Sequence, residues 1–194
     1  MKKIIIALAL IFSIVICLPS CAGNNYEEEF NKLNTLADKD YSFYTIDIEV
    51  KNNNGDMSVK ENYMVTSVNG TRTVKYSIER LNDFVVDGDN IFVPNDYMNI
   101  SSGTLSTTEA ESDKYAFPKF DFSSKTLIVH TLTNKGTYSH MHASVTSFES
   151  FMGRSIEGSD GQINVYYNNN QINSIEISFA NQSGNFTTIT YTIQ

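Results

Sequence analysis

Two histidines, His140 and His142, flank Met141 and could act as metal ligands. Alternate residues of a strand point to the same side, so both imidazoles would lie on one face, with Glu149 or His130 as a possible third ligand. A histidine pair without a third ligand at a defined spacing is more typical of polar residues that face solvent. We therefore expect no metal site here.

Two clusters of oxygen-bearing side chains could suggest calcium, at residues 52–56 (Asn-Asn-Asn-Gly-Asp) and 87–90 (Asp-Gly-Asp-Asn). The twelve-residue calcium loop, with glycine at its sixth position and glutamate at its end, is missing. Asn-Gly and Asp-Gly sequences between apolar runs are instead typical of hairpin turns. The sequence predicts turns at both places.

Catalytic motifs are missing from the chain. It has no Gly-x-Ser-x-Gly, no Ser-x-x-Lys and no glycine-rich phosphate loop, and only three histidines could serve as a base. Aspartates and glutamates that are distant in sequence could still meet in space, but nothing nominates a pair. We expect a protein that is not an enzyme and needs no cofactor.

One cysteine, Cys21, stands where covalent modification is expected. Met1-Lys2-Lys3 is positively charged, residues 4–17 form an apolar run, and small residues surround Cys21, a layout typical of a secretory signal. The run is too short to span a bilayer comfortably.

Within this signal, Leu18-Pro19-Ser20-Cys21 resembles the lipobox of bacterial lipoproteins, although proline is a less usual filler of its position. The resemblance implies that residues 1–20 are removed, that Cys21 is acylated, and that residues 21–25 form a tether. The protein would then be held at the extracytoplasmic face of the cell membrane by lipid alone. The alternative is an ordinary secreted protein. The sequence leaves open whether the protein is located on the outer surface or in a periplasm.

The charge of the chain excludes some partners. Loss of residues 1–20 would leave 12 basic against 22 acidic residues. This excess of acidic residues argues against nucleic acid as a partner and against adhesion to anionic lipid headgroups. Only Cys21 would remain, so no disulfide, cysteine nucleophile or cysteine metal site is available.

Apolar spacing predicts one helix and then strands. Tyr26, Phe30, Leu33 and Ala37 form one stripe of a short helix. Alternating runs then predict strands at 44–50, 59–66 and 74–79, separated by two Asn-Gly turns, and a hairpin at 84–93. Further strands are predicted at 138–146, 163–167, 172–179 and 186–193, with one helical turn at 148–152 that ends at Gly153.

Two segments carry weaker signals. Residues 95–119 are polar and show little periodicity, which predicts a long loop or a mobile flap. Residues 120–132 are ambiguous, because Ser123 or Ser124 could cap a helix whereas Ile128 and Val129 are β-branched. We expect a helix there. Together these elements predict one α+β domain over residues 26–194, built on a single antiparallel sheet.

This order of elements is similar to that of the LolA/LolB-like lipoprotein carrier family, and it covers most of residues 26–194 without a diagnostic motif. The resemblance implies a strongly curved sheet that forms half a barrel, with the N-terminal helix and short helices on its concave side. An acyl chain or another lipid would lie between sheet and helices. Candidate ligand-binding residues are Tyr44, Ile46, Tyr63, Val74, Tyr76 and Phe92. The best known carrier of the family is soluble, whereas this chain would be anchored through Cys21.

Two functions follow. The first is a lipid-anchored, non-enzymatic envelope protein that holds an apolar ligand, since an apolar sheet face needs either a close-fitting cover or a ligand. The second is a surface interaction module with a filled core, whose polar sheet face or 95–119 segment would contact another protein. The sequence identifies neither the ligand nor the partner, and it leaves the oligomeric state open.

Overall fold

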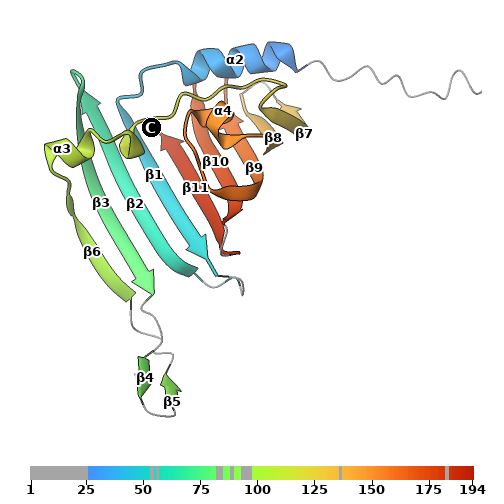
Figure 1. Ribbon diagram of the computed structural model, residues 1–194. Helices are drawn as coiled ribbons and strands as arrows, with labels where there is room; N and C mark the ends of the chain where they lie inside the picture. Colours follow the sequence, from blue (N-terminus) through green and yellow to red (C-terminus); the bar gives the residue numbers. More distant parts are fainter. Residues whose placement is uncertain are drawn as a thin grey trace, which may run out of the picture.

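Nine strands form one open antiparallel sheet in a computed structural model that describes residues 26–52, 55, 57–81, 85–87, 90–92, 98–135, 137–181 and 184–194. The order across the sheet is β6-β3-β2-β1-β11-β10-β9-β8-β7, and it is not closed into a barrel (Figure 1). The strands are β1 Phe43–Lys51, β2 Met57–Val68, β3 Thr71–Leu81, β6 Met98–Thr104, β7 Leu127–Asn134, β8 Ser139–Val145, β9 Gly158–Tyr167, β10 Ile172–Asn181 and β11 Phe186–Ile193. The predicted single antiparallel sheet is confirmed.

The remaining elements are short. A separate hairpin pairs β4 (Val85–Asp87) with β5 (Asn90–Phe92), as predicted. The helices are α2 Glu27–Ala37, α3 Thr107–Ala110, the 3-10 helix η1 Asp113–Tyr115, and α4 Phe148–Met152.

The β2–β3 hairpin shows how local chemistry fixes the strand register. Asn69 and Gly70 both have positive φ angles, 51° and 79°, which a two-residue turn of this handedness requires and which asparagine and glycine tolerate best. The turn sets Val65 opposite Val74 and Tyr63 opposite Tyr76. Cross-strand partners share a face, so these side chains all lie on the same side of the sheet. We call this side, which also carries Tyr44 and Tyr191, the inner face.

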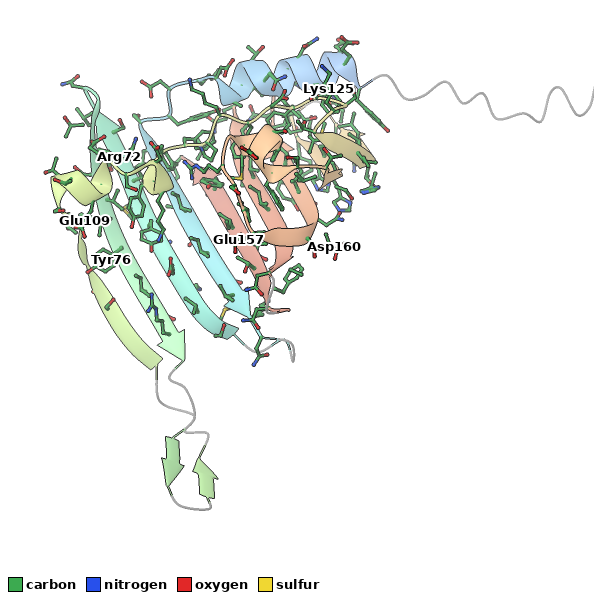
Figure 2. All side chains as sticks on the ribbon, viewed as in Figure 1. Arg72, Tyr76, Glu109, Lys125, Glu157 and Asp160 are labelled. Atoms are coloured by element: carbon green, nitrogen blue, oxygen red, sulfur yellow. The ribbon has the colours of Figure 1, made fainter. Side chains whose placement is uncertain are left out.

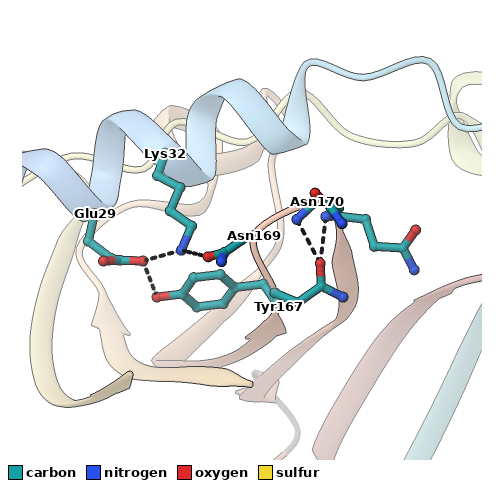
Figure 3. A network of polar contacts seen from close by, with 7 residues as sticks. Glu29, Lys32, Tyr167, Asn169 and Asn170 are labelled. Atoms are coloured by element: carbon teal, nitrogen blue, oxygen red, sulfur yellow. Dashed lines mark hydrogen bonds and ion pairs between the residues drawn. The ribbon is translucent and has the colours of Figure 1, made fainter. Parts of the chain in front are cut away.

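Helix α2 packs its apolar stripe into the core, as predicted. Phe30, Leu33, Leu36 and Ala37 are all buried. Polar contacts then fix the helix to the turn between β9 and β10 (Figure 3). The Tyr167 hydroxyl donates to Glu29 Oε1 at 2.7 Å, and Lys32 Nζ lies 3.4 Å from the same oxygen and donates to Asn169 at 3.2 Å.

The prediction of a loop at residues 95–119 is wrong for most of its described part. The segment contains strand β6, which pairs with β3 from Leu81–Met98 to Lys75–Thr104, and then α3 and η1. Ser106 begins α3 through a capping box with Glu109, in which each side chain bonds to the backbone of the other residue. Polar residues therefore form an edge strand here, because pairing with β3 outweighs their weak β-propensity.

The prediction of a helix at residues 120–132 is also wrong, because β7 begins at Leu127. A single turn forms first, in which the amides of Thr126 and Leu127 donate to the Ser123 carbonyl. The Thr126 hydroxyl bonds back to Asp121 O at 2.6 Å. The β-branched residues that follow then join the sheet beside β8 instead of continuing the helix.

Residues 105–122, which we call the strap, cross the inner face in front of β3, β2 and β1 (Figure 1). Two arginines hold the strap by its backbone carbonyls. Arg72 of β3 donates to Ala110 O and Ser112 O, both at 3.0 Å, and Arg72 is labelled in Figure 2. Arg154, which follows α4, donates to Ala116 O at 2.7 Å and to Lys114 O at 3.3 Å. The strap is therefore fixed by hydrogen bonds, although most of residues 106–114 are exposed.

Helix α4 packs against the strap and against β10. Gly153 ends it with a φ angle of 66°, as predicted from a glycine at this position. Phe151 is fully buried and lies 5.2 Å from the Phe120 ring of the strap, while Phe148 lies 5.4 Å from Phe179 of β10, measured between ring centroids. Buried residues of the strap, α2 and α4 thus belong to one hydrophobic core.

Candidate ligand-binding face

The inner face of the sheet has a covered part and an uncovered part. Under the strap, the row Tyr63–Ile46–Tyr191 and the row Val74–Val65–Tyr44 are at most 2% exposed. The Tyr44 hydroxyl donates to Tyr115 O of the strap at 2.5 Å, and the Phe117 ring contacts the rings of Tyr44 and Tyr191 edge to face. This part of the face is packed as a protein core.

The candidate ligand-binding residues fall mostly in this covered part. Tyr44, Ile46, Tyr63 and Val74 lie on neighbouring strands and on one face, but they are buried under the strap rather than on an open surface. Tyr76 lies next to Tyr63 at the boundary and is half-buried. Phe92 belongs to β5, and its side chain lies outside the described part of the structure.

Beyond these rows the inner face is mostly apolar, and the described residues leave it uncovered. Five half-buried aliphatic side chains form this surface, which we call the open patch: Ile48, Val50, Val59, Ile78 and Ile189. Figure 1 shows β1, β2 and β3 extending well beyond the strap at this end. At a strand spacing of about 4.8 Å, the patch spans roughly 14 Å from β11 to β3.

One carboxylate interrupts the apolar surface. Glu61 lies between Ile48 and Ile78 in the pairing of β1, β2 and β3, and its side chain is 14% exposed. The Tyr63 hydroxyl donates to Glu61 Oε2 at 2.7 Å. Lys114 of the strap donates to the Tyr63 hydroxyl at 3.0 Å and lies 3.5 Å from the same carboxylate oxygen.

The contact with Glu61 affects both Tyr63 of β2 and Lys114 of the strap. Burial, followed by the hydrogen bond to Glu61 and its charge, raises the pKa of Tyr63 far above its usual value. Lys114 also lies 4.8 Å from the centroid of the Tyr63 ring and 5.4 Å from that of Tyr115. A lysine between two aromatic rings and a carboxylate ties the strap to the sheet where the covered part ends.

The space between α2 and the sheet is filled. Leu33 of α2 and the facing residues Tyr167, Ile172 and Ile175 are all 0% exposed. Two hollows of about 330 and 320 Å³ lie beside α2, one lined by residues 37–41 and 116–119 and the other by residues 26–34 and 121–124. Both are bounded by charged and polar groups as well as aromatic rings, so neither matches the apolar interior that the family resemblance implies.

The histidines lie on the opposite, outer face, each bonded to a neighbour. His140 Nε2 is 3.0 Å from Asn164 Oδ1 and its ring stacks on Tyr166, while His142 Nε2 is 3.0 Å from Gln162 Oε1. The His130 and His142 rings are 5.3 Å apart. Among the described residues, no three side chains of His, Cys, Asp or Glu are grouped as metal ligands would be.

Sequence analysis missed the residues that shape this face. The alternate positions Val59, Glu61, Tyr63 and Val65 are apolar except for Glu61. This charged residue on an otherwise apolar strand face was the available signal for Glu61. Lys114, Arg72 and Arg154 gave no such signal. Their roles depend on where the strap crosses the sheet, which only the fold determines.

Comparisons with known proteins add no functional assignment. No model of a known protein family matches the chain, and no curated protein matches it. Within the described residues, the structure contains no helix of the length and apolar character needed to cross a membrane. The functional argument therefore rests on the geometry of the inner face.

Proposed function

We propose that this protein is a non-enzymatic lipoprotein, anchored at the extracytoplasmic face of the cell membrane, that holds an apolar ligand such as an acyl chain on the open patch. The observation that carries the proposal is the continuity of the inner face. Apart from Glu61, the inner face continues from the buried rows with the aliphatic side chains Ile48, Val50, Val59 and Ile78, where the described chain provides no cover.

Such a surface favours an apolar occupant. In a sheet with one face in water, each strand alternates apolar residues on the inner face with polar residues on the outer face. The apolar face then requires a cover. An alkyl chain laid across the patch would contribute about 0.8 kcal/mol for each methylene that it removes from water. A dodecyl chain offers enough methylenes for this gain to offset the cost of association, whereas a chain of a few methylenes does not.

The resemblance to the LolA/LolB-like family suggests how the ligand would lie relative to the sheet and the helices. In a LolA/LolB-like arrangement the sheet would be a strongly curved half barrel, with α2, α3 and α4 on its concave side and the ligand beside them. The complete burial of Leu33 on α2 and of Ile175 on β10 argues against a ligand directly under α2. We place the ligand instead on the part of the same face that lies beyond the strap.

Membrane attachment would depend on Cys21, which lies outside the described residues. Two or three acyl chains at this cysteine would give durable anchoring, whereas one would not. Metabolic labelling with a clickable fatty acid tests this: we expect label on the wild-type chain and none on Cys21→Ser. Absence of label from the wild type, or equal label on both chains, would refute the anchor.

Ligand binding is tested with a neutral alkyl probe, dodecanol, on the mature domain. Val50→Thr combined with Val59→Thr keeps the shape of two patch residues but adds hydroxyls, so we expect roughly tenfold weaker binding. Thr190→Val makes the reverse exchange on the outer face of β11 and should leave the affinity unchanged. Equal affinities for all three chains would contradict a site on the open patch.

The interaction module remains a second candidate, because the close packing between α2 and the sheet favours a filled core. Deleting residues 95–119 is not a suitable test, since it would remove β6 and the strap. Substituting the exposed residues Thr107 and Thr108 of α3 leaves both in place. Under this alternative, the substitution would abolish capture of a partner protein without lowering the stability of the domain.

A further inference from the structure

Two cationic side chains border the open patch around a single carboxylate. Lys114 Nζ lies 3.5 Å from one oxygen of Glu61, and Arg80 Nη2 lies 3.8 Å from the other. Glu61 is 14% exposed, whereas the side chains of Lys114 and Arg80 are 50% and 62% exposed. The two cations are thus accessible from the side that a ligand would approach, and their combined charge exceeds that of Glu61 by one.

Neither cation is fully engaged. A lysine has three N–H donors and an arginine has five. Lys114 donates to the Tyr63 hydroxyl at 3.0 Å, while the distance between Arg80 and Glu61 is longer than a normal hydrogen bond. Both side chains therefore keep donors that could bind a further anion.

Two acidic side chains of the strap have partners elsewhere, while a third, Asp113, is the chain neighbour of Lys114. Glu109 accepts from the hydroxyl of Ser106 at 2.7 Å within its own capping box, and Glu111 accepts from the backbone N–H of Arg72 at 2.5 Å. Among the described residues, Glu61 is the acidic side chain that forms ion pairs with both Lys114 and Arg80. The negative charge of the whole chain opposes adhesion to an anionic surface, but a single ligand responds to the charges within about 8 Å, the range that salt leaves unscreened.

We propose, building on the proposed function, that the ligand of the open patch is an amphiphile with one anionic head group, a carboxylate or a phosphate. The head group would bind between Lys114 and Arg80. Its alkyl chain would lie over Val59, Val50 and Ile48, away from the strap. Charge-assisted hydrogen bonds beside an apolar surface would then select the head group, while the patch binds the chain.

Calorimetry with three probes tests this proposal: dodecanoate and dodecyl phosphate below their micelle concentrations, and dodecanol below its solubility limit. We expect both anions to bind about tenfold more tightly than the alcohol in low salt, with the difference shrinking in 300 mM salt. An advantage confined to dodecyl phosphate would narrow the head group to a phosphate.

Variants locate the effect. Lys114→Gln combined with Arg80→Gln should reduce the affinity for the anions to that for dodecanol and leave dodecanol binding unchanged. Lys60→Gln combined with Lys75→Gln removes an equal charge from the outer face of β2 and β3 and should change neither. Unfolding midpoints of each variant show that the domain remains folded.

The outcomes separate the two proposals. Binding of dodecanol with no advantage for either anion would overturn the anionic head group and leave the proposed apolar site intact. An anion advantage that survives in the double variant would also overturn it. Failure of all three probes to bind would overturn both proposals together.

Discussion

The side-chain amide of Asn34 pairs with the backbone of Phe122 through two hydrogen bonds of 2.9 Å, one to its carbonyl oxygen and one from its N–H. This pair connects the middle of α2 to the end of the strap, across 88 positions of the chain. A side-chain amide supplies one donor and one acceptor in the spacing that a single backbone unit requires. The cover of the inner face thus behaves as one body and not as two independent segments.

Asn34→Ala should therefore destabilise the domain by about 2 kcal/mol, because it leaves both backbone groups of the buried Phe122 without a partner. Urea unfolding followed by circular dichroism measures the change. Asn31→Ala, on the exposed side of the same helix, is the control and should cost less than about 0.5 kcal/mol. Equal effects of the two substitutions would show that the amide pair does not hold the cover.

Arg154→Gln should loosen the strap. The guanidinium donates to the carbonyls of Lys114 and Ala116, and its loss should cost about 1–3 kcal/mol. Arg80→Gln is the control, since Arg80 is 62% exposed and makes only a long ion pair. Hydrogen exchange gives a second measurement: protection of the strap amides should fall in Arg154→Gln and not in Arg80→Gln. Unchanged protection would contradict the role of Arg154.

Gly161→Ala should be destabilising because an added Cβ would lie 2.5 Å from Phe148 Cζ. Both residues are buried, so the ring must move, at a cost of about 1–3 kcal/mol. Phe148→Leu removes the obstructing atoms. We expect the double variant to be more stable than the sum of the two single effects predicts, as measured by a double-mutant cycle. Simple additivity would mean that the two side chains do not meet.

Stability should decline in alkaline solution. Burial, followed by the hydrogen bond to the neighbouring glutamate, raises the pKa of Tyr63 beside Glu61 and of Tyr167 beside Glu29. The unfolded chain loses these protons near pH 10 while the folded chain keeps them. The stabilisation is therefore complete below pH 10 and falls above it, by about 1.4 kcal/mol per pH unit for each tyrosine.

Urea midpoints between pH 8 and pH 11 measure this dependence. Tyr63→Phe and Tyr167→Phe should each make the decline above pH 10 shallower, because phenylalanine has no proton to lose. Tyr138→Phe, which changes a tyrosine that is 44% exposed, should leave the slope unchanged. A decline of equal slope in all four chains would contradict the coupling of the two buried tyrosines to folding.

The sequence predicts this fold well where local signals and tertiary pairing agree. The turn at Asn69 and Gly70, the stripe of α2 and the glycine that ends α4 are all local features, and all three predictions are confirmed. Strand β6 was missed because Met98–Thr104 has little β-propensity and is set by its partner β3. Strand β7 was missed because the turn at Ser123 imitates the start of a helix.

The candidate site was predicted only in part. Alternation placed Tyr44, Ile46, Tyr63 and Val74 on one face, but it could not say that the strap would bury them. The strap depends on contacts between residues that are distant in sequence, such as Arg154 with Ala116. Periodicity therefore predicts which residues share a face, and not which part of that face stays uncovered.

The central claim is that an apolar ligand occupies the uncovered part of the inner face, and photo-crosslinking tests it most directly. A dodecanol analogue with a diazirine on its alkyl chain is irradiated with the mature domain, and the labelled residues are located by peptide mass spectrometry. We predict labels on β1, β2 and β3 at and around Ile48, Val50, Val59 and Ile78, which unlabelled dodecanol suppresses. Labels confined to the outer face or to the hollows beside α2, or no suppressible label at all, would contradict the claim.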